Sequence, residues 1–177
     1  NKNHKTGTDR INEAINKLGR TDVELVMNLQ GDEPLMNVAD IQKLHAQMVK
    51  TKFELGTLAS NITDQELYDN LNVVKVVTKE SLDNSQFPEA INFTRKLNDR
   101  PKNIYKHLGI YCYKLQTLEK FVSFNQSVNE IKYKLEQLRA LDNEMKINVA
   151  FADSSPIGVD TEEDFVAIKK IMEYKSK

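Results

Sequence analysis

Short apolar runs alternate with helix-patterned segments along most of this 177-residue chain. The runs at 23–29, 55–59 and 73–77 are short and rich in aliphatic or β-branched residues, which is typical of buried strands. A segment of helical periodicity follows the first run, and Asn37 is a suitable N-cap for it. This alternation predicts an α/β fold with a mixed, mostly parallel sheet flanked by helices.

The rest of the chain continues the pattern and predicts a single domain over residues 1–177. An opening helix is expected to start at Thr8 or Asp9 and to stop at Gly19. A last helix begins at Thr161. The other expected elements are strands at 90–94, 107–113 and 146–152, a short helix headed by the capping-box pattern Thr63–Glu66, and helices at 116–124 and 130–142.

Composition excludes several classes of protein. A formal net charge of −1 argues against a general binder of nucleic acid or of a membrane surface, because both need a basic field. No stretch reaches the roughly 18 apolar residues of a membrane span, and no signal peptide opens the chain. The single cysteine, Cys112, excludes an internal disulfide framework and suits a reducing compartment. We therefore expect a cytoplasmic protein with neither a nucleic-acid nor a membrane partner.

The segment Gln30-Gly31-Asp32-Glu33-Pro34 directly follows the first predicted strand. A carboxylate at the C-terminal end of a buried strand faces the crevice where open α/β sheets bind ligands. Asp32 is then placed to hold a hard cation such as Mg²⁺, with substrate phosphates completing the shell. The alternative is a polar turn whose acid caps a helix, and spacing alone does not separate the two.

A second acid, Asp160, comes just before the last predicted helix. It could join Asp32 at a metal, or it could cap that helix, a role that Thr161 could also take. The turn Thr6-Gly7-Thr8 opens the first predicted helix and offers N–H groups and hydroxyls to an anion, although such residues are also common caps.

Three basic side chains could bind carboxylate or phosphate, although residues of this kind are more often surface or interface residues. They are Arg95, His107 and Arg139. His4 and His45 have no partner at zinc spacing, so no zinc site is predicted.

Six motifs occur together and in one order. They are Thr6-Gly7-Thr8-Asp9-Arg10, Asn28-Leu29-Gln30-Gly31-Asp32-Glu33-Pro34, Asn72-Val73-Val74-Lys75-Val76-Val77, His107-Leu108-Gly109-Ile110-Tyr111, Leu135-Glu136-Gln137-Leu138-Arg139 and Gly158-Val159-Asp160-Thr161-Glu162-Glu163-Asp164. This ordered set resembles the 3-deoxy-manno-octulosonate cytidylyltransferase (CMP-Kdo synthetase) family, and the resemblance runs over essentially the whole chain.

The resemblance implies a Rossmann-like, GT-A-like nucleotidyltransferase fold and, usually, a homodimer. It implies transfer of CMP from CTP to 3-deoxy-D-manno-octulosonate (Kdo), giving CMP-Kdo and pyrophosphate for lipopolysaccharide biosynthesis. Carried over by motif, Asp32 and Asp160 are the expected catalytic Mg²⁺ ligands. Thr6, Gly7, Thr8 and Gln30 are the expected nucleotide contacts. The expected sugar-acid pocket consists of Arg95, His107, Tyr111, Glu136 and Gln137.

The sequence departs from the family pattern in three places. The family opens with a phosphate-cradling strand and loop, including Pro-Ala-Arg, which has no counterpart in these 177 residues. The family segment Phe-Ser-Arg-x-x-Ile-Pro keeps Arg95, but the residues after it differ, and a family acid three residues before Glu136 is Tyr133 here. From the first departure we expect this chain alone to be inactive and marginally stable, with only the metal and Lys75 left to offset the triphosphate charge.

The sequence is compatible with two other functions. One is cytidylyl transfer to another acidic sugar, such as 8-amino-Kdo or a nonulosonate, which the altered loop after Arg95 and Tyr133 would allow. The other is a non-catalytic binding or assembly subunit.

Overall fold

The computed structural model describes residues 4–20, 22–83, 86–97, 99, 101–156, 158–159 and 161–175. Among the predicted site residues, only Asp160 falls outside these ranges, so its expected role as a metal ligand or a cap stays a prediction.

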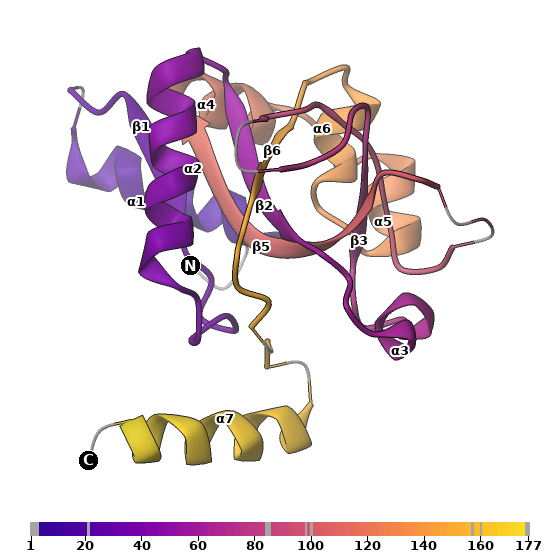
Figure 1. Ribbon diagram of the computed structural model, residues 1–177. Helices are drawn as coiled ribbons and strands as arrows, with labels where there is room; N and C mark the ends of the chain where they lie inside the picture. The colour runs from indigo at the N-terminus through magenta and orange to yellow at the C-terminus, as the bar shows by residue number, and fades with distance from the viewer. Residues whose placement is uncertain are drawn as a thin grey trace.

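A six-stranded sheet forms the centre of the fold (Figure 1). Its strands are β1 (Leu25–Asn28), β2 (Leu55–Ser60), β3 (Lys75–Thr78), β4 (Ala90–Thr94), β5 (Ile104–Lys114) and β6 (Asn148–Phe151). They lie in the order β4-β3-β5-β2-β6, and β1 also pairs with β5. The long strand β5 therefore contacts three neighbours and joins the two halves of the sheet.

Strand direction differs from the expectation. The α/β class with a mixed sheet is confirmed, but among the described strands only β2 and β6 pair in parallel. The strands β1, β2 and β3 all run antiparallel to β5, and β3 runs antiparallel to β4. Alternation of strands and helices favours parallel strands joined by helical crossovers, whereas an antiparallel neighbour needs no such crossover.

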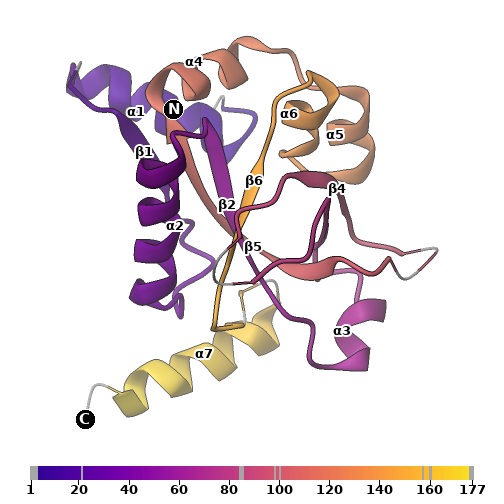
Figure 2. The ribbon, with the colours of Figure 1, turned by 45° about the horizontal axis from the view of Figure 1, so that its top comes forward.

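Helices cover both faces of the sheet (Figures 1 and 2). They are α1 (Gly7–Leu18), α2 (Val38–Thr51), α3 (Gln65–Asp69), α4 (Leu115–Ser123), α5 (Val128–Tyr133), α6 (Leu138–Asp142) and α7 (Glu162–Lys175). Leu44 and Met48 of α2 pack with Leu58 on one face, while Leu118 and Phe121 of α4 belong to the core on the other. Alternate residues of the buried strand β2 thus serve two separate cores.

Helix α2 begins where the sequence predicts, whereas α1 begins at Gly7, one residue before the expected Thr8. Thr6 caps α1 in a capping box with Asp9, and Gly19 ends it in the left-handed conformation at φ 60°. Asn37 caps α2 through a hydrogen bond that its side chain accepts from Ala39 N. Local capping chemistry therefore fixes both boundaries.

The helix predicted over 130–142 is two helices. Ser127 and Glu130 form the capping box of α5, which ends at Lys134 in a left-handed conformation at φ 54°. Ile131, expected on the inner face, is 61% exposed. The break occurs because Leu135 turns into the core, and it leaves residues 134–137 as a non-helical segment between α5 and α6.

The last helix, α7, lies apart from the sheet in both views (Figures 1 and 2). Thr161 caps it, because its N–H and hydroxyl both donate to Asp164, whose own N–H donates back to Thr161. Of its predicted inner face, Ile168 is buried, whereas Phe165 and Met172 are half exposed. No helix in the described part of the chain is long and apolar enough to cross a membrane.

Candidate active site

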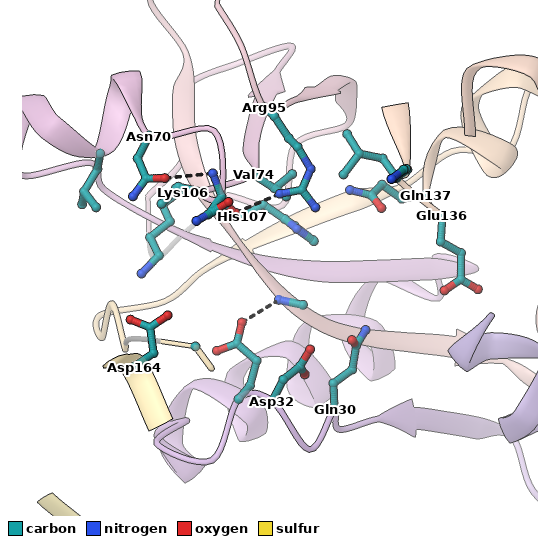
Figure 3. A pocket seen from close by; sticks show the side chains of 18 of the residues that line it. Gln30, Asp32, Asn70, Val74, Arg95, Lys106, His107, Glu136, Gln137 and Asp164 are labelled. Carbon is teal, nitrogen blue, oxygen red and sulfur yellow. Dashed lines mark hydrogen bonds between the residues drawn. The ribbon is translucent and has the colours of Figure 1, made fainter. Parts of the chain in front are cut away.

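A cavity of about 540 Å³ collects most of the residues that the sequence analysis singled out. Seven of them line it: Gln30, Asp32, Arg95, His107, Tyr111, Glu136 and Gln137. Figure 3 shows Gln30 and Asp32 on one side of this pocket, with Arg95 and Lys106 on the opposite side. These residues come from the loop after β1, from β5, from the end of β4 and from the segment between α5 and α6.

The loop after β1 carries the acidic side of the pocket. Asp32 is exposed, and its carboxylate makes no hydrogen bond or ion pair with a described residue. It is not a helix cap, since Asn37 caps the helix that follows. The backbone N–H of Val159 donates to Asp32 O at 2.8 Å. The loop after β1 therefore lies beside Gly158 and Val159, which precede the predicted ligand Asp160 in the sequence.

Arg95 is anchored through only part of its guanidinium group. Its Nη1 donates to Leu71 O at 3.1 Å and to Asn72 O at 3.0 Å. The remaining donors of the guanidinium fork are available to a ligand in the pocket. Arg95 thus presents a cation whose position is fixed by the turn between α3 and β3.

Lys75 is not a phosphate ligand, contrary to the expectation. Its side chain is fully buried, and its Nζ donates to Asn70 O at 2.6 Å and to Arg95 O at 2.8 Å. Burial lowers the pKa of Lys75, with the nearby charge of Asp69 opposing that shift. The amine ties two pocket-lining residues together from behind the pocket wall.

His107 is a neutral member of the pocket. It is 9% exposed on β5, and burial lowers its pKa to about 3. Its Nε2 lies 3.0 Å from Thr57 Oγ1 in β2. The rings of Phe93 and Tyr111 lie against the imidazole, at centroid distances of 5.1 Å and 5.5 Å.

The far end of the pocket combines Tyr111 with the segment between α5 and α6. Burial raises the pKa of Tyr111 well above its ordinary value, so its hydroxyl stays protonated. Gln137 is buried, and Glu136 accepts a hydrogen bond from Thr8 N at 3.2 Å. Tyr133, which stands where the family has an acid, does not line this pocket but a neighbouring groove.

The Thr6-Gly7-Thr8 turn reaches the pocket only indirectly. None of its residues is among the described residues that line the pocket. Thr8 does, however, donate a hydrogen bond to Glu136, and Glu136 lines the pocket. Thr8 is buried, and its hydroxyl lies 3.4 Å from Tyr113 Oη. The expected nucleotide contacts of this turn remain a prediction.

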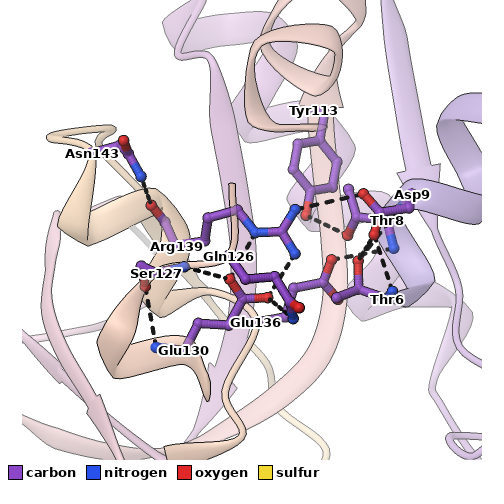
Figure 4. A network of polar contacts seen from close by, with 10 residues as sticks. All are labelled: Thr6, Thr8, Asp9, Tyr113, Gln126, Ser127, Glu130, Glu136, Arg139 and Asn143. Carbon is purple, nitrogen blue, oxygen red and sulfur yellow. Dashed lines mark hydrogen bonds and ion pairs between the residues drawn. The ribbon is translucent and has the colours of Figure 1, made fainter. Parts of the chain in front are cut away.

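Behind that turn lies a buried polar network (Figure 4). Arg139 donates to Glu130 through Nη2 at 2.6 Å and Nε at 2.8 Å, and it lies over the ring of Phe121. Burial alone would raise the pKa of Glu130, but the hydrogen bonds from Arg139 and Gln126 outweigh it and lower that pKa. Arg139 is therefore a structural residue and not a ligand clamp.

Sequence reasoning missed three polar residues that line the pocket: Asn70, Lys106 and Lys134. Lys106 Nζ donates to Pro156 O at 2.7 Å and so holds the loop before α7 against the pocket. Its only sequence signal is its place directly before the His107 motif. Asn70 and Lys134 end the short helices α3 and α5, whose boundaries become visible only in the structure.

The carboxylates of the pocket suit a magnesium ion that is also bound by phosphates and water, rather than a metal that is held by protein ligands alone. No group of three or more His, Cys, Asp or Glu residues in the described part of the chain could hold a metal by itself. Magnesium usually takes one or two carboxylates and completes its shell with phosphates and water. An exposed Asp32 beside Gly158 and Val159 fits that pattern.

Comparison with known proteins agrees with this arrangement. A family model described as cytidylyltransferase matches residues 1–147. The 3-deoxy-manno-octulosonate cytidylyltransferase of Bartonella tribocorum is 38% identical over 173 residues, which cover 96% of this chain and 70% of the relative. The corresponding protein of Afipia carboxidovorans is 39% identical over 173 residues, covering 96% and 68%.

Solved structures agree as well. CMP:2-keto-3-deoxy-manno-octonic acid synthetase, complexed with CTP, superposes with a TM-score of 0.82 at 28% identity, covering 98% of this chain and 70% of that chain. Apo UDP-glucose pyrophosphorylase has a TM-score of 0.69 at 12% identity, covering 99% of this chain and 62% of that chain, and shows only that the fold is shared. The chain therefore belongs to the cytidylyltransferase family, among the 3-deoxy-manno-octulosonate cytidylyltransferases.

Proposed function

We propose that this protein transfers CMP from CTP to Kdo, releasing pyrophosphate and giving CMP-Kdo for lipopolysaccharide biosynthesis in the cytoplasm. The observation that carries the proposal is the pocket, which gathers seven expected nucleotide, metal and sugar residues from four distant parts of the chain. The relatives at 38% and 39% identity bear the name of this activity.

The basic side of the pocket suits an acidic sugar. Arg95 retains free guanidinium donors after binding two backbone carbonyls, and such a fork can bind both oxygens of the Kdo carboxylate. His107, Tyr111 and Gln137 are held neutral or are neutral by nature, which suits a polyhydroxylated sugar. In this proposal they bind hydroxyl groups and leave the carboxylate to Arg95.

The acidic side suits the nucleotide and its metal. In this proposal Gln30 and the Thr6-Gly7-Thr8 turn contact CTP, and Asp32 with Asp160 would hold Mg²⁺. When bound, Mg²⁺ supplies Lewis-acid neutralisation of phosphate charge. The residues of this chain then orient the anomeric hydroxyl of Kdo toward the α-phosphorus, and pyrophosphate leaves.

A homodimer is also proposed. A second groove runs between β4 and the helices α5 and α6, where Ile91 is 57% and Tyr133 is 49% exposed. Exposed apolar residues gathered in one groove are typical of a protein–protein contact. Sedimentation velocity tests the proposal, and a monomer mass at assay concentrations would rule it out.

The activity is tested by measuring pyrophosphate release from CTP in the presence of Kdo and Mg²⁺, with the protein expressed from its complete gene. We expect release that requires all three components. The Asp32→Ala variant should lose about 100-fold or more in kcat/KM, or roughly 2.7 kcal/mol of transition-state stabilisation. Asp22→Ala is the matched control, because Asp22 is an exposed acid that pairs with Arg20 on the surface. Equal loss in both variants, or no release by well-folded protein, would overturn the assignment.

A further inference from the structure

Thr57 lies at the point where the pairing of β2 with β5 shifts register. The pairing passes from Thr57 opposite Tyr111 to Leu58 opposite Leu108, so β5 carries extra residues there. Thr57 is fully buried, and its Oγ1 fills this bulge, 2.7 Å from Ile110 O and 3.4 Å from Leu108 O. The same oxygen lies 3.0 Å from His107 Nε2.

These distances determine where the protons are. A threonine hydroxyl has one proton, and two oxygens 2.7 Å apart repel each other unless that proton lies between them. The proton of Thr57 is therefore committed to Ile110 O. Toward His107, the Thr57 oxygen can then only accept a hydrogen bond. Nε2 of His107 must therefore carry the N–H.

We propose that Thr57 is a positioning residue that holds His107 in the Nε2–H tautomer, so that Nδ1 offers a lone pair to a hydroxyl of the sugar substrate. Nδ1 makes no hydrogen bond to any described residue, and His107 lines the pocket. The flanking rings of Phe93 and Tyr111 limit rotation of the imidazole. Neutral imidazole has one donor and one acceptor nitrogen, and Thr57 has already taken the donor.

The consequence is a specificity filter, and this part of the inference rests on the proposed function. A bare lone pair attracts a hydroxyl and repels a carboxylate. His107 therefore favours a sugar hydroxyl in its part of the pocket and turns the carboxylate toward Arg95. If the tautomer were reversed, Nδ1 would be a donor and that discrimination would be lost.

The tautomer itself can be measured without substrate. In a long-range ¹H–¹⁵N spectrum of the ligand-free protein at neutral pH, we expect His107 to show a pyrrole-type Nε2 and a pyridine-type Nδ1. The His107→Gln variant assigns the signals against His4 and His45. In Thr57→Val, which has nearly the same shape but no hydroxyl, this pattern should shift toward the other tautomer, and Thr57→Ser should keep it. An Nδ1–H tautomer in the native protein would overturn the proposal, as would an unchanged pattern in Thr57→Val.

Kinetics separate the positioning role from a general loss of structure. We expect Thr57→Val to raise KM for Kdo about tenfold while leaving KM for CTP unchanged, and Thr57→Ser to restore it. A parallel rise in both KM values would show that Thr57 is only structural. Absence of any turnover with Kdo in the native protein would refute the proposed function, whereas the spectrum would still decide the tautomer.

Discussion

Two buried ionisable side chains of this protein are each held by one or two well-defined partners. His107 rests on one threonine hydroxyl, and Lys75 rests on two backbone carbonyls. The motif resemblance could identify His107, but Thr57 stands 50 residues away along the chain, in no motif that marks it. Lys75 looked like a phosphate ligand in the sequence because a lysine gives no sign of whether its amine reaches solvent.

The buried His107 predicts how stability depends on pH. Its folded pKa of about 3 lies below the ordinary value of 6.5, so the unfolded chain takes up a proton that the folded protein refuses. Its contribution to stability is complete above pH 6.5 and falls as the pH drops toward 3. Between pH 7.5 and pH 5 we expect the free energy of unfolding to fall by about 2 kcal/mol from this residue.

Urea unfolding at a series of pH values measures this effect. The His107→Gln variant should lack this part of the slope between pH 6.5 and 5, and His45→Gln on the surface helix α2 should retain it. Equal slopes for the native protein and His107→Gln would contradict the buried, neutral histidine.

At the scale of elements, the break between α5 and α6 shapes the pocket. Leu135 and Leu138 stand at helical spacing with Ile131, and no glycine or proline marks Lys134, so a continuous helix was the natural prediction. The break is stabilised by tertiary contacts, because Arg139 of α6 reaches back to Glu130 of α5. The Ser127–Glu130 capping box was the one local signal that α5 starts early.

Removing one partner of that buried ion pair should therefore destabilise the part of the protein formed by α5, α6 and the segment between them. In Glu130→Gln, the Arg139 guanidinium stays buried and keeps Asp9, at 3.5 Å, as an ion-pair partner, with the charge of Glu136 nearby. We expect a loss of about 3 kcal/mol in the free energy of unfolding, measured by urea denaturation. Glu119→Gln, on the exposed side of α4, is the control and should change stability by less than about 0.5 kcal/mol. A similarly small change in stability for Glu130→Gln would show that the Glu130–Arg139 ion pair does not stabilise the arrangement of α5 and α6.

At the scale of the molecule, the pocket exists because distant segments meet around β5. The sequence predicts the α/β class, the caps and most of the elements, since those depend on local patterns. It does not predict that three strands run antiparallel to β5, or that Val159 bonds to Asp32 O, because both depend on long-range pairing. The motif resemblance predicts the site residues, but only the three-dimensional structure shows that seven of them converge on one pocket.

The central claim is that the residues that converge on this pocket bind Kdo as the substrate of CMP transfer. The most direct test is to measure kcat/KM for pyrophosphate release with Kdo, with 8-amino-Kdo and with a nonulosonate. Each assay contains CTP and Mg²⁺ and uses the protein expressed from its complete gene. The account predicts the highest kcat/KM for Kdo, by at least about tenfold, with CMP-Kdo as the product identified by mass. A higher value for either other sugar, or no turnover of any by folded protein, would contradict it.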